Sequence, residues 1–453
     1  MLSISSRMDI FLHIPSELAC HIVANWLCLK SVVHLDGAYC NKASRVKLFA
    51  TVLSSHCCVL SQPLGPYRFQ IYLDWVVRRS VRIDSVVISP DVDLPLLEAY
   101  LQCFPHLIRL VNVLEVCDHK DGFSRIMSIV AQNCTKLVSL VCNDCILTDS
   151  VQNLLAACTQ LEEIRFIDCP DSGRYNDIRS SSQEPLKLKT IELICGELSA
   201  VSVLQHRLSS CACLSMSCAT EAPIYKFMEQ LRSYTSLVSL GFIDTDVLTD
   251  DLMVQIVTLC PQLLQLQLVH CCELTDVSGA AISEKLAQLK ELKVKGCSFT
   301  DMTLSALALY RRDTLVSLHV GGCSLLTSAG HNTVLSQCLK LNTYGFSYLL
   351  NITPTFLSNL TTLYLEDIRS IASLNVLLSG GGVVQHLFLQ LTAINSCQLN
   401  FTSLSAELLP NLRVISISTI WPSLRTEPPT LQELRLLRPT LTIKYNTGQT
   451  ANT

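Results

Sequence analysis

One pattern recurs along the middle of this chain at a fixed distance. It consists of a leucine, two variable residues, a leucine, one variable residue, a leucine, two more variable residues and often a cysteine. It reads LLQLQLVHC from Leu263, LKELKVKGC from Leu289 and LVSLHVGGC from Leu315. Degraded copies start at Leu237 and Leu341, so five successive copies stand 26 residues apart. A fixed period of this kind means that one structural unit is stacked repeatedly, and it limits the possible folds more than any other property of the chain.

The internal spacing and the period, within the range of about 20 to 29 residues, are the signature of leucine-rich repeats. The alternating leucines predict a short strand with its apolar side chains on one face. The runs between these strands have helical apolar spacing, and Thr-Asp pairs before them supply side chains that can cap a helix. These pairs are Thr148-Asp149, Thr249-Asp250, Thr275-Asp276 and Thr300-Asp301. The sequence therefore predicts an α/β leucine-rich-repeat solenoid, a horseshoe with a parallel inner sheet and outer helices.

The same template, extended outward, predicts the domain organisation. About 15 repeats fill residues 83–440. They start near Ile83, Leu107, Leu137, Leu161, Leu188, Cys211, Leu237, Leu263, Leu289, Leu315, Leu341, Leu360, Val384, Leu412 and Leu431. Residues 10–53 do not fit the template and are predicted to form short helices, with residues 54–82 as a linker or cap. Residues 441–453 carry no periodicity, so a disordered tail is expected there.

Composition limits the partners and the compartment. The formal net charge of −4 gives no reason to expect nucleic acid or an acidic membrane as a partner. No stretch has the ~20 apolar residues of a membrane span, and the amino terminus lacks the pattern of a secretory signal. Nine of the 23 cysteines occupy two fixed positions of the repeat, which favours buried, reduced thiols. We therefore expect a cytoplasmic protein, with the nucleus as the other compartment that the sequence allows.

No motif for catalysis or for a cofactor is found in the sequence. The run Gly380-Gly381-Gly382 lacks the Lys and Ser/Thr of a phosphate-binding loop, and neither HExxH nor GxSxG occurs. The pairs Cys142/Cys145 and Cys271/Cys272 are the alternative candidates for metal ligands, but no second pair stands at zinc-finger distance. We expect no enzymatic activity, no cofactor and no metal.

The amino-terminal segment carries a second recognisable pattern. It begins IPSEL at Ile14, continues as an apolar helix, breaks, and resumes with Val32 and Leu35 in a second helix. Followed by cysteine-containing leucine-rich repeats, it resembles the F-box/leucine-rich-repeat proteins, with a divergent F-box. The family usually has a Trp in the third helix, where this chain has Leu48-Phe49.

This resemblance implies a function. Members of the family are non-enzymatic substrate-receptor subunits of SCF-type (cullin-RING) ubiquitin ligases, which recruit a target protein for ubiquitin-dependent degradation. In them the F-box binds a Skp-family adaptor, and through it the cullin. The adaptor-binding positions carried over to this chain are Ile14, Pro15, Leu18, Ile22, Val32 and Leu35. The alternative is a stand-alone leucine-rich-repeat scaffold or signalling regulator, whose first helices only cap the first repeat.

Strand geometry predicts the surface that would contact a target, because the variable residues of each repeat face the concave side. The target-binding candidates at such positions are Asp144, Arg165, Asp168, Gln267, His270, Lys293, Lys295, His319, Tyr348 and Tyr364. Lys293 and Lys295 stand two apart on one strand, which predicts a locally basic strip. We expect an acidic or phosphorylated segment of the unknown protein target to dock there. The alternative is a merely solvated strand face.

Overall fold

The computed structural model describes the repeats most completely in the middle of the chain. The described residues are 34, 46, 58–59, 74–75, 77–78, 83–88, 94–102, 107, 109–113, 120–143, 149–167, 169, 188–194, 211–217, 221–231, 234, 236–347, 352–368, 374, 377–391, 401, 404, 409–419 and 429–447. They fall into two compact units, one made of residues 1–216 and 233–236 and the other of residues 217–232 and 237–453. Of the segment 10–53, only two single residues are among them.

The first unit contains seven of the described strands, each paired in parallel with the next in chain order. They are β1 (Cys58–Val59), β2 (Ile83–Ile88), β3 (Arg109–Val113), β4 (Ser139–Asn143), β5 (Glu163–Ile167), β6 (Thr190–Ile194) and β7 (Cys213–Met216). The described helices of this unit are α7 (Leu94–Leu101), α8 (Lys120–Asn133) and α9 (Asp149–Ala157).

The second unit holds the most regular repeats, and its strands also pair in parallel in chain order. The strands are β8 (Ser239–Ile243), β9 (Gln265–Val269), β10 (Glu291–Lys295), β11 (Ser317–Gly321), β12 (Thr343–Ser347), β13 (Thr362–Ile368), β14 (His386–Leu391), β15 (Val414–Thr419) and β16 (Thr442–Thr447). The helices are α11 (Glu221–Leu231), α12 (Asp250–Leu259), α13 (Asp276–Lys285), α14 (Asp301–Tyr310), α15 (Ser328–Gln337), the 3₁₀ helix η3 (Pro354–Asn359) and α17 (Pro429–Leu437).

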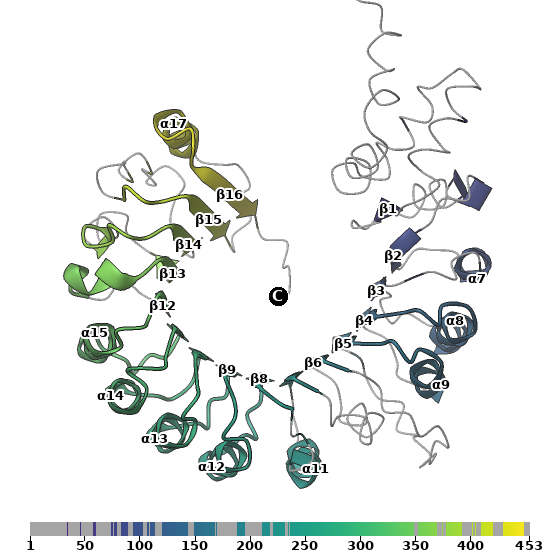
Figure 1. Cartoon of the computed structure of the whole chain (residues 1–453), viewed down its shortest axis with the longest axis horizontal. Coiled ribbons are helices and arrows are strands. Elements are labelled where there is room, and N and C mark those ends of the chain that lie inside the picture. Colours follow the sequence, from purple (N-terminus) through teal and green to yellow (C-terminus); the bar gives the residue numbers. More distant parts are fainter. Residues whose placement is uncertain are drawn as a thin grey trace, which may run out of the picture. The chain divides into compact units, whose positions relative to one another are not determined.

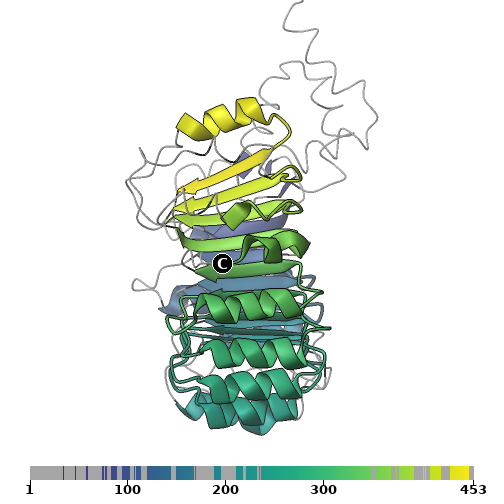
Figure 2. The same cartoon turned by 90° about the vertical axis from the view of Figure 1, so that its left-hand side faces the viewer.

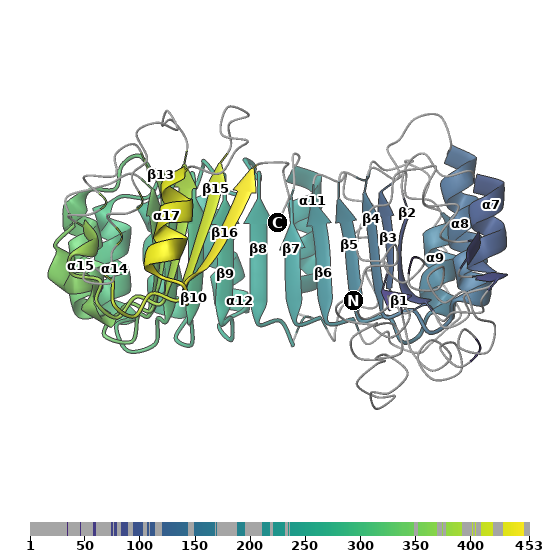
Figure 3. The ribbon, with the colours of Figure 1, turned by 90° about the horizontal axis from the view of Figure 1, so that it is seen from above.

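Within the second unit, the strands and the helices form two separate layers. Strands β8 to β12 line the inner side, and helices α12 to α15 cover the outer side (Figure 1). These helices lie one above another (Figure 2), and the strands run side by side in one direction (Figure 3). The predicted leucine-rich-repeat fold, with a parallel inner sheet and outer helices, is therefore confirmed.

The core consists of the residues that define the repeat. The first leucines of the five regular repeats, Leu237, Leu263, Leu289, Leu315 and Leu341, are all buried. The cysteines at repeat positions are buried free thiols, and burial raises the pKa of Cys158, Cys260 and Cys338 to about 11. These thiols therefore stay protonated and pack as small apolar groups. No helix in the described part of the chain is long and apolar enough to span a bilayer.

The Thr-Asp pairs do more than cap single helices. Helices α12, α13 and α14 begin at their aspartates, and the Thr275 and Thr300 hydroxyls each accept a hydrogen bond from a first-turn amide. Each aspartate also binds the threonine of the following repeat. Asp276 accepts hydrogen bonds from the Thr300 amide at 2.9 Å and from the Thr303 hydroxyl at 2.6 Å.

The same contact recurs from repeat to repeat. Asp250 accepts a bond from the Thr275 amide at 2.9 Å, and Asp301 accepts one from the Thr327 amide at 2.8 Å. Each carboxylate therefore lies beside the positive ends of two successive helices, where a negative charge is favoured. We call this series of contacts the aspartate ladder. It joins four successive repeats on the side of the helix N-termini.

The ends of the repeat array differ from the sequence prediction. The last repeat was expected to start at Leu431, but that segment is helix α17, because Leu431 and Leu434 stand three apart and are buried on one helix face. The strand comes later, as β16, within residues predicted to be a disordered tail. It alternates weakly in sequence and is held by pairing with β15. Strand β1 likewise lies inside the predicted linker and pairs with β2.

Removing one carboxylate of the aspartate ladder should destabilise the repeats. Asp276→Ala removes the acceptor of four hydrogen bonds from the next repeat, although the Thr303 amide keeps the Thr300 carbonyl as a second acceptor. We expect the free energy of unfolding, measured with urea, to fall by about 2 kcal/mol. Asp251→Ala is the matched control, because Asp251 lies in the first turn of α12 but is exposed. An equal loss in both variants would contradict the ladder.

The ladder also predicts a dependence of stability on pH. Burial opposes the ionisation of Asp250 and Asp276, but hydrogen bonds from the next repeat outweigh it and keep the pKa of both below its usual value. Their contribution is therefore present above the unfolded pKa of about 3.9 and is lost as the pH falls through the lower folded pKa. We expect the Asp250→Asn/Asp276→Asn variant to lose less stability than the wild type on acidification below about pH 4. If the free energy of unfolding, measured with urea at each pH, falls as steeply in the variant as in the wild type, this expectation is contradicted.

Candidate functional site

The inner face of the second unit presents side chains in rows that cross the strands. On β10, Leu292 and Val294 are buried in the core, so Lys293 points to the opposite face. Strand pairing aligns Lys293 with the equivalent residue of each neighbouring strand. This middle row consists of Gln267, Lys293, His319, Gly345, Tyr364, Phe388 and Ser416, on β9 to β15.

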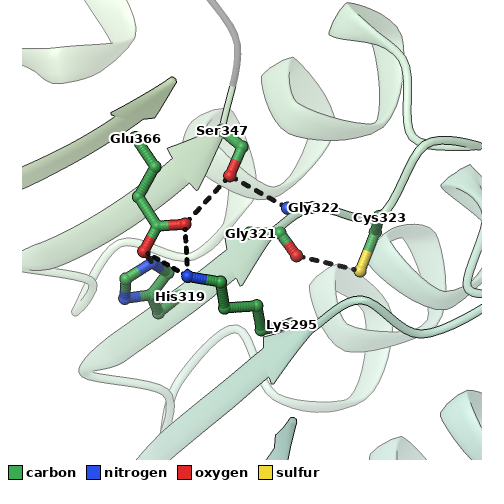
Figure 4. Close-up of polar contacts among 7 residues, drawn as sticks. All are labelled: Lys295, His319, Gly321, Gly322, Cys323, Ser347 and Glu366. Atoms are coloured by element: carbon green, nitrogen blue, oxygen red, sulfur yellow. Dashed lines mark hydrogen bonds and ion pairs between the residues drawn. The ribbon is translucent and has the colours of Figure 1, made fainter. Parts of the chain in front are cut away.

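A carboxylate holds the centre of this face together. Glu366 Oε2 on β13 lies 3.1 Å from Lys295 Nζ on β10, and its Oε1 lies 3.3 Å from His319 Nε2 on β11 (Figure 4). The His319 ring lies within ion-pairing distance of the carboxylate, but the geometry is not that of a well-formed hydrogen bond. The Ser347 hydroxyl donates to Glu366 at 3.1 Å and accepts from the Gly322 amide at 2.9 Å. We call Lys295, His319, Ser347 and Glu366 the Glu366 cluster.

Two glycines make room for these long contacts. Lys295 and Glu366 stand on strands separated by β11 and β12, so a side chain at Gly321 would obstruct them. A Cβ at Gly321 would lie only 2.7 Å from Glu366 Oε2, and one at Gly345 would lie 2.7 Å from His319 Cγ. The absence of these two side chains therefore lets Glu366 and His319 lie across the neighbouring strands.

Aromatic rings continue the middle row beyond Gly345. The His319 ring stacks on Tyr364 with centroids 5.6 Å apart and an interplanar angle of 28°. Tyr364 in turn stacks on Phe388 with centroids 4.2 Å apart and an angle of 9°. All three side chains are partly exposed, so the sheet presents a continuous ring surface to solvent.

The electrostatics of the face follow from burial and from these neighbours. Burial opposes the ionisation of Glu366, but His319 and Lys295 outweigh it and lower the pKa of the carboxyl to about 2. Burial and the charge of Lys295 both lower the pKa of Lys293, while Glu366 opposes this shift. Among the described residues, Lys293 has no ion-pair partner within 4.0 Å, whereas Lys295 is paired with Glu366.

The structure brings five of the ten predicted target-binding residues to the inner face of β9 to β13. They are Gln267, Lys293, Lys295, His319 and Tyr364. His270 follows β9 in a left-handed backbone conformation (φ 53°), and its ring lies where a Cβ on Gly296 would be 2.6 Å from its Nδ1. It is exposed at the edge of the face.

The other predicted residues are separate from this group. Arg165 belongs to the first unit, where its guanidinium lies 2.8 Å from Glu163 Oε1 and 3.2 Å from Glu192 Oε2. Asp144, Asp168 and Tyr348 lie outside the described residues, as do the six adaptor-binding positions Ile14, Pro15, Leu18, Ile22, Val32 and Leu35.

The sequence pattern puts Glu366 on the inner face but does not reveal which residues organise the site. The predicted strip at Lys293 and Lys295 is not uniformly basic, because Glu366 neutralises Lys295 from 71 residues further along the chain. Ser347, Gly321 and Phe388 were also not singled out. Their signal lies in the register, since each occupies an inner-face position of its strand. What the register does not reveal is how far a long side chain can reach across a glycine.

Comparisons with known proteins found a partial similarity to one repeat protein and several solved structures. No family model matches it. An F-box/LRR-repeat MAX2 homolog from Oryza sativa subsp. japonica is 27% identical over 232 residues, which cover 48% of this chain and 30% of that protein. The resemblance to F-box/leucine-rich-repeat proteins is thus confirmed for the aligned part, while the chain matches less than a third of that relative's length.

Solved structures with a similar course of the chain were also found. Internalin InlF from Listeria monocytogenes has a TM-score of 0.36 and 18% identity and covers 85% of this chain and 89% of its own. The structure of Rad7 in complex with Elc1 from yeast has a TM-score of 0.41 and 15% identity, and the match covers 97% of this chain and 95% of that chain. The structure of TLR13 bound to ssRNA13 has a TM-score of 0.36 and 16% identity, and the match covers 82% of this chain and 56% of that chain.

The glycine gap at the Glu366 cluster can be tested by filling it. Gly321→Ala would force the Glu366 carboxylate away, and we expect it to cost about 1 to 3 kcal/mol of unfolding free energy. Gly382→Ala is the matched control, because a Cβ there meets nothing within 4 Å.

The same substitution in a Glu366→Ala background tests whether the clash with Glu366 causes the loss of stability. If the clash with Glu366 is responsible, Gly321→Ala should cost markedly less there than in the wild type, which a double-mutant cycle of urea unfolding measures. Equal costs in both backgrounds would show that the carboxylate does not need the gap.

Proposed function

We propose that this leucine-rich-repeat protein is a non-enzymatic substrate receptor of an SCF-type ubiquitin ligase. The observation that carries the proposal is the 232-residue match to an F-box/LRR-repeat protein, combined with the F-box-like order of residues 10–53 ahead of the repeats. A receptor contributes proximity between a target and the ligase. It therefore needs a binding surface rather than reacting groups.

In this proposal, two parts of the chain bind two different partners. A Skp-family adaptor, which links the receptor to a cullin, contacts the predicted adaptor-binding residues. We call these residues the apolar stripe; they are Ile14, Pro15, Leu18, Ile22, Val32 and Leu35. The inner face of β9 to β14 holds the target protein. The chemistry of this face supports its role in target binding, because aromatic side chains and partly desolvated charges on a rigid sheet are what a protein-binding hot spot requires.

The compartment follows from the same proposal. A receptor of this kind works in the cytoplasm or the nucleus. The free cysteines among the described residues support it, since thiols remain unpaired in a reducing environment.

The competing function is a stand-alone repeat scaffold or signalling regulator. The observation in its favour is that no family model matches the chain, the F-box-like segment included. In that case the first helices serve only as a cap over the open end of the first repeat. Disruption of the apolar stripe should abolish adaptor binding if the chain is a ligase receptor, and should lower the stability of the fold if the segment is only a cap.

Adaptor binding by the full chain decides between these two functions. Leu18→Asp/Ile22→Asp places charges on the apolar stripe, and burying an unpaired charge costs several kcal/mol. We expect this variant, and a chain lacking residues 1–53, to lose capture of a purified Skp-family adaptor in a pull-down.

Folding and the control are read in the same samples. Circular dichroism melts should be unchanged in Leu18→Asp/Ile22→Asp, and Lys293→Gln, on the inner face, should still bind the adaptor. If the charged variant instead melts at a lower temperature, the stripe is a cap. If the wild-type chain does not bind the adaptor at all, the ligase role is refuted.

A further inference from the structure

The middle row of the inner face is chemically ordered from one end to the other. Lys293 lies near one end, next to the Gln267 amide, and Phe388 lies near the other, next to Ser416, with His319 and Tyr364 between them. The row therefore passes from a cation to stacked rings within five strands.

The two ends are the features that remain for a partner. His319 is engaged with Glu366 and with the Tyr364 ring. Lys293 lacks an ion-pair partner among the described residues. One face of Phe388 stacks on Tyr364, and the next position of the row holds the small side chain of Ser416, which leaves the other face without a stacked ring among the described aromatic contacts.

The charge at the cationic end is small. Lys295 is paired with Glu366, whose pKa is about 2, and Glu291, exposed two residues before Lys293, adds a negative charge on the same face of β10. Lys293 is therefore the lysine at this end that lacks an ion-pair partner among the described residues. It matches a carboxylate, whereas a phosphate group carries close to two negative charges at neutral pH.

The spacing sets the length of the partner. Lys293 and Phe388 are four strand intervals apart, which is about 19 Å at the usual separation of about 4.8 Å. An extended peptide rises about 3.3 Å per residue, so about six residues span this distance. Glu366 lies beside His319, in the middle of this path, and disfavours a second acidic residue there.

From these observations we propose that the middle row binds an extended protein segment in which a Glu or Asp side chain pairs with Lys293. An aromatic side chain about six residues along the segment stacks on Phe388. This inference rests on the proposed function, because it names the chemistry of the segment that the inner face would capture. It replaces the broader expectation of an acidic or phosphorylated segment with a carboxylate and an aromatic residue at a defined spacing.

Labelled synthetic peptides test the inference on the full-length chain. The peptides carry one Glu and one Phe separated by two to eight randomised neutral residues, and binding is measured by fluorescence anisotropy. We expect the tightest binding when about five residues separate them. We also expect Lys293→Gln and Phe388→Ala each to weaken that peptide by about tenfold or more.

The controls keep the outcome unambiguous. Lys290→Gln should leave binding unchanged, because Lys290 is an exposed lysine that precedes β10 and lies outside the middle row. Phe388→Leu retains an apolar side chain without the ring and guards against a folding defect in Phe388→Ala. Replacing Glu by phosphoserine should not tighten binding.

Several results would overturn the inference. These are no binding at any spacing, binding that does not depend on spacing, no effect of Lys293→Gln, or much tighter binding of the phosphoserine peptide. Failure of the ligase role is distinguishable, because adaptor capture would then be absent while peptide binding follows the pattern described. Conversely, adaptor capture with no peptide binding would overturn only this inference.

Discussion

Each repeat of this chain can bury its leucines only against its neighbours in the array, and the rest of the structure depends on that constraint. The parallel strand pairs place equivalent residues side by side, so Leu266, Leu292 and Leu318 form one buried row. Burial of one face of a strand forces the alternate residues onto the other face. The core and the inner surface are therefore two consequences of the same register, and a shift of one residue would exchange them.

Polar contacts reinforce the stack where the leucines cannot. The aspartate ladder joins successive helix N-termini, and the Glu366 cluster joins β10, β11, β12 and β13 on the inner face. Both connect residues of different repeats rather than residues within one. Because an unpaired carboxylate in such a place is costly, these contacts favour one register of the array over others.

The inner face combines rigidity with unequal chemistry along its length. Its side chains stand on strands, so their positions are set by the backbone and not by mobile loops. Because Lys295 pairs with Glu366 and Tyr364 stacks between His319 and Phe388, Lys293 and the outer face of Phe388 are the parts of the row with most to gain from a partner. This arrangement suits selection of an extended segment by the spacing of its side chains.

The repeat period determined the fold class, the strands from β2 to β15 and the helix starts at Asp250, Asp276 and Asp301, because a motif recurring every 26 residues permits only stacked strand–helix pairs. It also placed Lys293, Lys295, His319 and Tyr364 on one face. It failed at β16, where pairing with β15 outweighs a weak sequence pattern, and at Leu431, where the same leucine spacing fits a helix. Only the tertiary structure decided that Glu366 binds Lys295 across two strands, because that contact depends on the space left by Gly321 and on distances between repeats that no local pattern encodes.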